Sequence, residues 1–241
     1  MAGLRGAGAF VAKVERDRTV CAARTQADRP ATFGHPESSI PNPPRPMRPL
    51  ILVGLLVFLF TAITVQALHP GYDWVHAPLS FYLSGPHGLW LQLAYVALAL
   101  AIALQSVRIW LRERRALADT LALLLFCAGA VGLVVTALYP GGSPAGAVPP
   151  FEHRLHLLSA LSAFGLTGLA MLLRGALDWR AGRRVLLPLA MLAFVCLLLH
   201  VGIRELPRGA SQKAVIALYL LWLCIHSWRI DAVGRVGREP H

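Results

Sequence analysis

The sequence has little charge for its length. Asp, Glu, Lys and Arg make up 15% of its 241 residues, whereas a soluble domain carries about 25%. Its four cysteines, Cys21, Cys127, Cys196 and Cys224, show no zinc or redox spacing, so we expect no disulfide. No catalytic signature names a reaction. The hydrophobic content of 56% instead indicates an integral membrane protein.

The charges that are present have one dominant sign. The formal net charge is +11, and a basic surface of that size can indicate binding to phosphates of a nucleic acid. Here the basic residues lie in alternate connections between apolar runs, and they form no stripe interleaved with aromatics. We therefore expect no nucleic-acid partner.

Six apolar runs are long enough to cross about 30 Å of hydrocarbon as helices. Lipid-exposed backbone has to satisfy its own hydrogen bonds, so helices are the only structure that suits these lengths. The sequence predicts an all-α integral membrane bundle of six transmembrane helices. The runs are approximately Leu50–Leu68, Gly88–Trp110, Leu117–Leu138, His153–Leu173, Val185–Ile203 and Ala214–Ile230.

The distribution of Lys and Arg predicts the orientation. The leading tail, the second and fourth connections and the C-terminal end carry nineteen, and the other three connections carry four. Cytoplasmic segments are the ones enriched in basic residues, so both termini are expected in the cytoplasm.

Three segments follow from these runs. Residues 1–48 are basic and Pro-rich without a helical or strand period, which is typical of a disordered tail. Met47 stands next to the first apolar run and is an alternative start, in which case the tail is not translated. Residues 49–230 form the six-helix transmembrane domain, and residues 231–241 form a short cytoplasmic tail.

Polar residues recur on three of the predicted helices. His153 and His156 share a face of the fourth with small residues that allow close helix packing, so this face and both histidines are expected to point into the bundle. The sixth has Gln212, Tyr219 and His226 at steps of seven. Such stripes form either interhelical hydrogen bonds or a polar path from His156 toward His226, which would suit a small-solute transporter.

Histidines and acids also gather at the outer face of the predicted topology. Zinc takes three or four N, O or S ligands, and a metal-bound water can attack an ester or amide. Asp73, His76, His153 and His156 are the candidate ligands of a metal-dependent hydrolase acting on lipids at the outer leaflet. The EHRLH run is not the HExxH pattern, so this enzyme stays an alternative to a binding role, and we expect no cofactor other than this zinc.

Four motifs resemble those of the domain-of-unknown-function 998 family of six-helix membrane proteins. They are PLSFYLSGPHGLW, ALYP, RLHLLSALSAF and GASQKAVIALYLLWL, and the likeness runs from about Leu50 to Trp228. Ser80 with Tyr82, Pro140, His156, and Gln212 with Lys213 stand at the family's motif positions. The acid of the family's Phe-Pro-x-Asp turn is absent, and Lys213 replaces the usual Arg.

The resemblance implies an uncharacterised multi-pass protein of the plasma membrane, here the bacterial inner membrane. We expect an outward-facing polar pocket that binds a small molecule or a lipid headgroup, with membrane lipid as partner. Its candidate residues are Ser80, Tyr82, His156, Arg204 and Gln212. A partner-binding subunit without a ligand is a further alternative, and the oligomeric state is left open.

Overall fold

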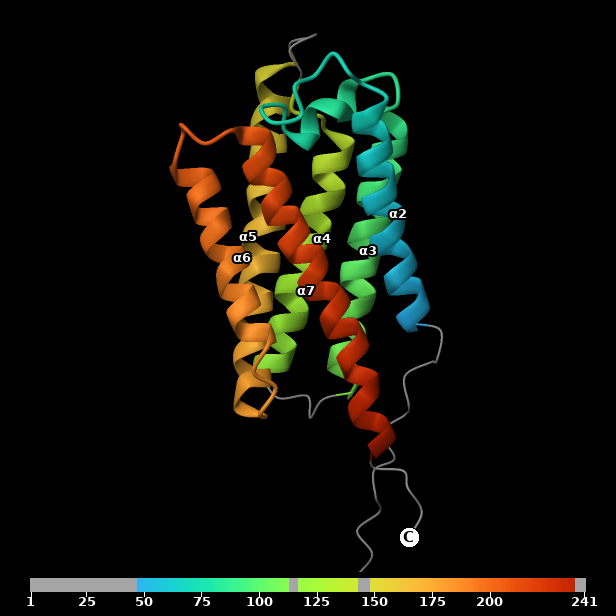
Figure 1. The fold of residues 1–241 in the computed structure, drawn as a ribbon, viewed down its shortest axis with the longest axis vertical. Helices are drawn as coiled ribbons and strands as arrows, with labels where there is room; N and C mark the ends of the chain where they lie inside the picture. Colours follow the sequence, from blue (N-terminus) through green and yellow to red (C-terminus); the bar gives the residue numbers. More distant parts are fainter. Residues whose placement is uncertain (1–46, 113–116, 143–147, 237–241) are drawn as a thin grey trace, which may run out of the picture. The chain divides into compact units, whose positions relative to one another are not determined.

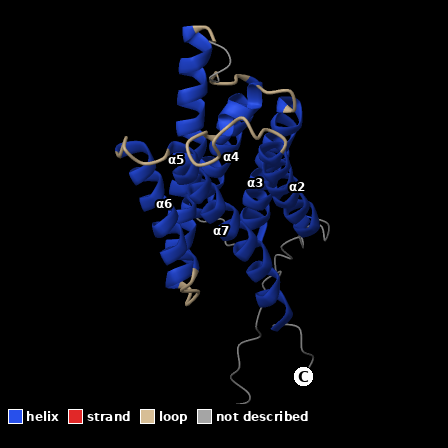
Figure 2. Ribbon diagram, turned by 45° about the horizontal axis from the view of Figure 1, so that its top comes forward, coloured by secondary structure: helices blue, strands red, loops and turns tan. Residues whose placement is uncertain are grey.

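The computed structural model describes residues 47–112, 117–142 and 148–236, with side chains to residue 229. All of them belong to one compact unit, Pro41–His241. Every described element is helical (Figure 2). The elements are α2 (Met47–Ala67), η1 (Leu79–Ser84, a 3₁₀ helix), α3 (Gly88–Arg112), α4 (Leu117–Leu138), α5 (Pro150–Arg180), α6 (Leu186–Gly202) and α7 (Arg208–Val236).

The six long helices alternate in direction, and each packs against the next in sequence (Figure 1). Helix α7 returns to contact α2 and α3. One end of the bundle carries η1 and the connections 68–87, 139–149 and 203–207, and we call it the η1 end. The opposite end carries the connection 181–185 and the last turns of α3, α5 and α7, and we call it the arginine end.

The predicted bundle is confirmed for five of its six spans. The helices α2, α3, α4 and α5, together with Arg208–Arg229 of α7, are long and apolar enough to cross a membrane. The sixth run forms α6, which has 17 residues and is shorter than these spans. Of the predicted tail, residues 1–48, Met47 and Arg48 begin α2, and residues 1–46 lie outside the described part, as do residues 237–241.

Helix ends follow from local sequence. Helix α4 stops before Tyr139-Pro140, and Gly142 then adopts a φ of 88°, which favours glycine. Helix α5 begins with proline in its first turn, where a missing N–H costs nothing. The close approach of α4 to α5 depends on Gly132, since a Cβ there would lie 2.9 Å from the Ser159 carbonyl oxygen.

Three predicted spans end short of their helices. We ended the second, fourth and sixth spans at Trp110, Leu173 and Ile230, but α3 continues to Arg112, α5 to Arg180 and α7 to Val236. Arg174 was therefore counted as a loop residue, and Arg108 was counted with the second connection although it precedes Trp110; both are buried inside the bundle. Hydropathy ended these spans too early because charged side chains that have buried partners look like connection residues in a sequence.

Candidate functional site

The start of α7 holds the α2–α3 connection in place. The Gln212 side-chain oxygen accepts a hydrogen bond from the Leu79 amide at 2.7 Å. The Lys213 ammonium donates to the carbonyl oxygens of Trp74 and Ala77. The Gln-Lys pair that carries the family resemblance thus satisfies backbone groups of a loop that would otherwise lack partners.

Tyr82 lies in η1 beneath this connection and is fully buried. Its ring packs edge-on against the rings of Tyr72 and His69, and the His87 ring also packs edge-on against that of His69. The Tyr82 hydroxyl and His69 Nε2 have no hydrogen-bond partner among the described residues. Burial raises the pKa of Tyr82 above 10.0, so its hydroxyl stays a proton donor.

His156 fastens the α4–α5 connection. Its Nδ1 donates to the Tyr139 carbonyl oxygen at 2.8 Å, and Nδ1 of His153 donates to the Gly141 carbonyl oxygen at 2.9 Å. The predicted inward face is confirmed for His156, which is buried, and is wrong for His153, which is exposed. His153 lies in the first turn of α5.

The predicted pocket residues lie in separate places. Tyr82 and Gln212 meet through η1, and Ser80 is half-buried there. Arg204 is exposed in the α6–α7 connection. In the part of the chain that the structure describes, no hydrogen bond or ion pair joins His156 or Arg204 to the η1 residues. The grouping of all five around one pocket stays a prediction.

The predicted zinc ligands are not brought together. No group of three or more His, Cys, Asp or Glu among the described residues could hold a metal ion. Asp73 and His76 pair with each other at 2.6 Å in the exposed α2–α3 connection. This hydrogen bond and that of the Val75 amide hold the pKa of Asp73 below 3.8. His153 and His156 are occupied by backbone carbonyls of a different connection.

A cavity lies in the middle of the bundle, among α2, α3, α4, α5 and α7. Its volume is about 40 Å³, and it is partly open to the surroundings. Its wall is almost entirely apolar. The lining residues are Phe58, Tyr95, Leu98, Ile102, Gly129, Leu133, Ala163, Phe164, Thr167, Ile216, Tyr219, Leu220 and Leu223.

Hydroxyl groups supply the polar atoms of this cavity. The Tyr219 hydroxyl donates to the Phe164 carbonyl oxygen at 2.8 Å, so it is already satisfied. Tyr95 also lines the cavity and is buried. A ligand group in this cavity would therefore meet an apolar wall with a few hydroxyl groups.

A buried ion network lies toward the arginine end, and our sequence analysis did not predict it. The Arg174 guanidinium donates to Asp119 at 2.9 Å and to Asp178 at 2.7 Å. Arg183, in the α5–α6 connection, donates to the same Asp178 oxygen at 2.6 Å. Charged groups inside an apolar bundle are costly unless they are paired, and this network pairs them across α4 and α5.

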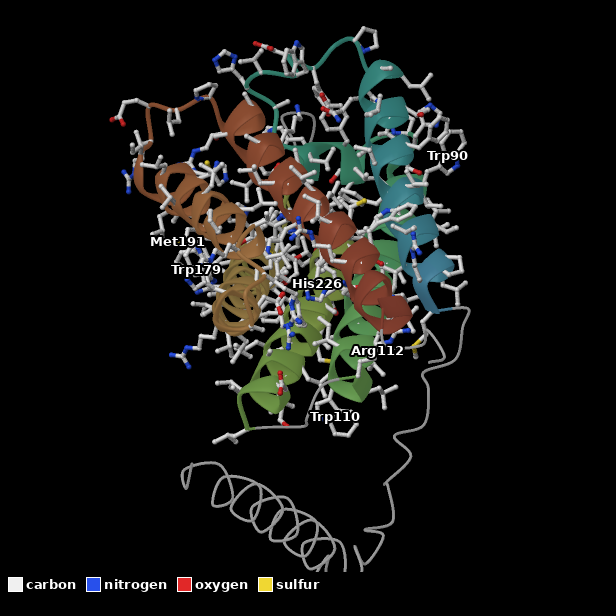
Figure 3. The ribbon with its side chains drawn as sticks, turned by 60° about the horizontal axis from the view of Figure 1, so that its bottom comes forward. Trp90, Trp110, Arg112, Trp179, Met191 and His226 are labelled. Carbon is white, nitrogen blue, oxygen red and sulfur yellow. The ribbon has the colours of Figure 1, made fainter. Side chains whose placement is uncertain are left out.

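His226 of α7 joins this network. It lies in the interior between the helices, whereas Trp110 and Trp179 lie on the outside (Figure 3). Its Nε2 is 3.6 Å from Asp178 Oδ2, and Nδ1 accepts a hydrogen bond from the Gln105 side chain at 2.8 Å. Nearby, Arg108 of α3 donates to the carbonyl and hydroxyl oxygens of Ser227.

One pattern in the sequence could have identified the network. Arg174 and Asp178 are four residues apart, a spacing that places opposite charges together on a helix. We predicted a polar stripe with His226 on the last helix. Asp178 was missed because the fourth span was ended at Leu173, about two turns before the end of α5.

Comparison with known proteins places the chain by family. Neither a search of the curated proteins nor a search of the solved structures gives a match. The model of the family described as "Protein of unknown function (DUF998)" matches residues 52–229. That range begins in α2 and ends in α7, so it contains all six long helices and both ends of the bundle. The chain belongs to the DUF998 family of proteins of unknown function.

Proposed function

We propose that the chain crosses the membrane six times, with both termini in the cytoplasm of a bacterial cell. Helix α6 runs antiparallel between α5 and α7, and its 17 residues are about 26 Å long at 1.5 Å per residue. Once the buried Arg108 and Arg174 are left out, the leading tail, the second and fourth connections and the C-terminal end carry seventeen basic residues in the sequence, and the other three connections carry four. This contrast supports a cytoplasmic arginine end in the inner membrane.

The protein's proposed role is to bind a lipid or another amphipathic molecule. This proposal rests on the cavity in the middle of the bundle, whose wall is apolar apart from hydroxyl groups. Burial of apolar surface drives binding in such a cavity, and few polar groups are needed to orient the ligand.

The η1 end supplies further polar groups for a headgroup or small molecule. The Tyr82 hydroxyl is buried and has no partner among the described residues, and such a group gains free energy from a ligand acceptor. Ser80, Gln212, His156 and Arg204 are the other proposed contacts of this outward-facing pocket. A ligand there would approach from the outer leaflet.

Stearic acid labelled with a doxyl radical tests the cavity directly. Leu220 lines the cavity, whereas its neighbour Leu221 is exposed on the outside of α7. Leu220→Trp should fill the cavity and lower the immobilised fraction of the probe in the electron paramagnetic resonance spectrum by about tenfold, the effect of losing roughly 1.4 kcal/mol of binding.

Leu221→Trp adds the same side chain one residue further on and is the matched control. It should leave the immobilised fraction as in the wild type. Equal binding by both variants, or no immobilised probe in the folded wild-type protein, would remove the cavity as the ligand site.

Transport of a small solute is a second candidate function. It is favoured by the ion network, since charged groups within membrane segments commonly mark solute or proton pathways. In a variant without native cysteines, cysteines introduced at Ser159 and Ser227 should react with a water-soluble thiol reagent if a path passes both. Unreactive cysteines in folded protein would exclude the path.

A further inference from the structure

The two ring nitrogens of His226 have different partners. The Gln105 amide nitrogen donates to Nδ1 at 2.8 Å, so Nδ1 acts as an acceptor and the ring hydrogen is on Nε2. That hydrogen faces Asp178 Oδ2 at a nitrogen–oxygen distance of 3.6 Å. The Trp222 ring stacks on the imidazole with centroids 4.8 Å apart. The imidazole is thus held in position, and it is 2% exposed.

The two oxygens of Asp178 also have different partners. Oδ1 accepts hydrogen bonds from Arg174 at 2.7 Å and from Arg183 at 2.6 Å and 3.2 Å. Oδ2 is the oxygen that faces His226. One buried carboxylate therefore interacts with two guanidinium groups on one side and with a titratable ring on the other.

A proton on His226 would bring a third cation to this carboxylate. At short range in a medium of low dielectric constant, like charges repel strongly. The charged groups that act on His226 are Arg108 of α3, Arg174 and Asp178 of α5, and Arg183 of the α5–α6 connection. Arg174 is also bonded to Asp119 of α4. The extra charge can be accommodated if one guanidinium moves away.

Arg183 is the guanidinium that can move. Arg174 is 2% exposed and is fixed between Asp119 and Asp178 within the helices. Arg183 follows the end of α5, and its side chain is 30% exposed, so it can reach water without unfolding a helix. Its loss from Asp178 would offset the charge that the proton adds.

We propose that His226 and Asp178 form a proton-binding site in which an imidazolium replaces the Arg183 guanidinium at Asp178. A hydronium ion gives its proton to the Nδ1 lone pair: its O–H bond breaks, a water molecule is released and a new N–H bond forms, while Nε2–H moves closer to Asp178 Oδ2. The Gln105 amide rotates so that its oxygen, which is buried without a partner, accepts from Nδ1–H. No other bond forms or breaks, and the ligand of the site is the proton itself.

Binding of this proton changes contacts beyond the site. Arg183 lies in the α5–α6 connection, three residues before Leu186, the first residue of α6. The Leu186 carbonyl oxygen accepts a hydrogen bond from the Trp222 indole at 2.9 Å. Release of Arg183 loosens the α5–α6 connection next to that contact. The proposal concerns residues outside the cavity, so it stands whether or not the cavity binds a lipid.

Nitrogen NMR of histidine side chains in lipid nanodiscs tests the site. The signal of His226 is assigned by its loss in His226→Gln, and its shift is followed between about pH 4 and 9, around the range in which protein histidines titrate. Arg183→Gln removes the competing cation and should move the midpoint of the titration upward by about one to two pH units, the usual effect of one close charge.

Arg184→Gln is the matched control. Arg184 is exposed and lies over the Trp179 ring, so its substitution removes the same charge without touching Asp178. It should move the midpoint by well under one pH unit. Equal shifts in both variants, or no titration of His226 in folded Arg183→Gln protein, would overturn the proposal. Both substitutions are in a surface connection, so gel filtration should show that both variants fold.

Discussion

The two ends of the bundle are held together by different chemistry. At the η1 end, side chains of Gln212, Lys213 and His156 bond to backbone groups of the connections. At the arginine end, Arg174 of α5 binds Asp178 of its own helix and Asp119 of the neighbouring helix α4. The η1 end therefore fixes loops onto helices, whereas the arginine end fixes helices to one another through charge.

This difference predicts where substitutions are costly. Removing one side chain from a hydrogen bond to a partly buried loop loses about 1 kcal/mol. Removing one member of a buried ion pair leaves an uncompensated charge and costs about 3–5 kcal/mol. The arginine end should be sensitive to single substitutions, and the η1 end should tolerate them.

The largest effect is expected from Asp178→Ala. The substitution leaves Arg174 and Arg183 without the carboxylate that both contact, and the free energy of unfolding should fall by about 3–5 kcal/mol. Unfolding in mixed micelles with increasing dodecyl sulfate measures this change. Glu205→Ala, in the exposed α6–α7 connection, is the control and should have almost no effect.

Gly132→Val tests whether the contact between α4 and α5 depends on the close fit of their surfaces. A Cβ at Gly132 would lie 2.9 Å from the Ser159 carbonyl oxygen, so α4 and α5 would have to separate, at a cost of about 1–3 kcal/mol. The same unfolding experiment applies. Gly165→Val is the control, because a Cβ there meets nothing within 4 Å. Equal losses in both would show that close helix approach is unimportant here.

Gln212→Ala measures the hold of α7 on the α2–α3 connection. The Leu79 amide loses its acceptor, and stability should fall by about 1 kcal/mol. Limited proteolysis should cut within residues 68–87 faster than in the wild type. Gln92→Ala is matched in side chain, and its hydrogen bond to the Leu83 carbonyl oxygen is long, at 3.5 Å, so cleavage there should change little. If Gln212→Ala lowered the free energy of unfolding as much as Asp178→Ala does, the two ends would not differ in their sensitivity to substitution.

The smallest effect is expected for Asp73. The pKa of the Asp73 carboxyl is lowered, mainly by the hydrogen bond with His76. The ionised carboxylate therefore stabilises the folded protein at pH values above the unfolded pKa of about 3.9. This stabilisation is lost as pH falls through the folded pKa. The Val75 amide, bonded to Asp73 at 2.9 Å, should report a titration below pH 3.8 in its NMR shift. Asp73→Asn should abolish this titration and leave unfolding unchanged. A midpoint above that value would contradict the hydrogen-bonded geometry.

Much of the fold could be predicted from the sequence. Runs of apolar residues about 20 long predict membrane helices because the hydrocarbon thickness sets their length. The predicted ends of the first and third spans, Leu68 and Leu138, agree within one residue with the ends of α2 and α4. The extension of α5 past Leu173 could not be predicted by hydropathy, since the buried Arg174 is compatible with a membrane helix only through its partners Asp119 and Asp178.

The candidate site was less predictable for the same reason. Inward and outward faces of a helix follow from its period, so the burial of His156 and the stripe of Gln212, Tyr219 and His226 were accessible. The contact of His226 with Asp178 depends on the relative depth of α5 and α7, which the period of neither helix contains. The roles of Gln212 and Lys213 as loop anchors likewise depend on where the connection folds.

A double-mutant cycle on Arg174 and Asp178 tests the central claim most directly. If Arg174 and Asp178 compensate each other's charge, Asp178→Leu alone should cost about 3–5 kcal/mol, and Asp178→Leu with Arg174→Leu should cost clearly less than the sum of the two single losses. Unfolding free energies of the four proteins give the coupling. A double variant whose loss equals the sum of the two single losses would contradict the account.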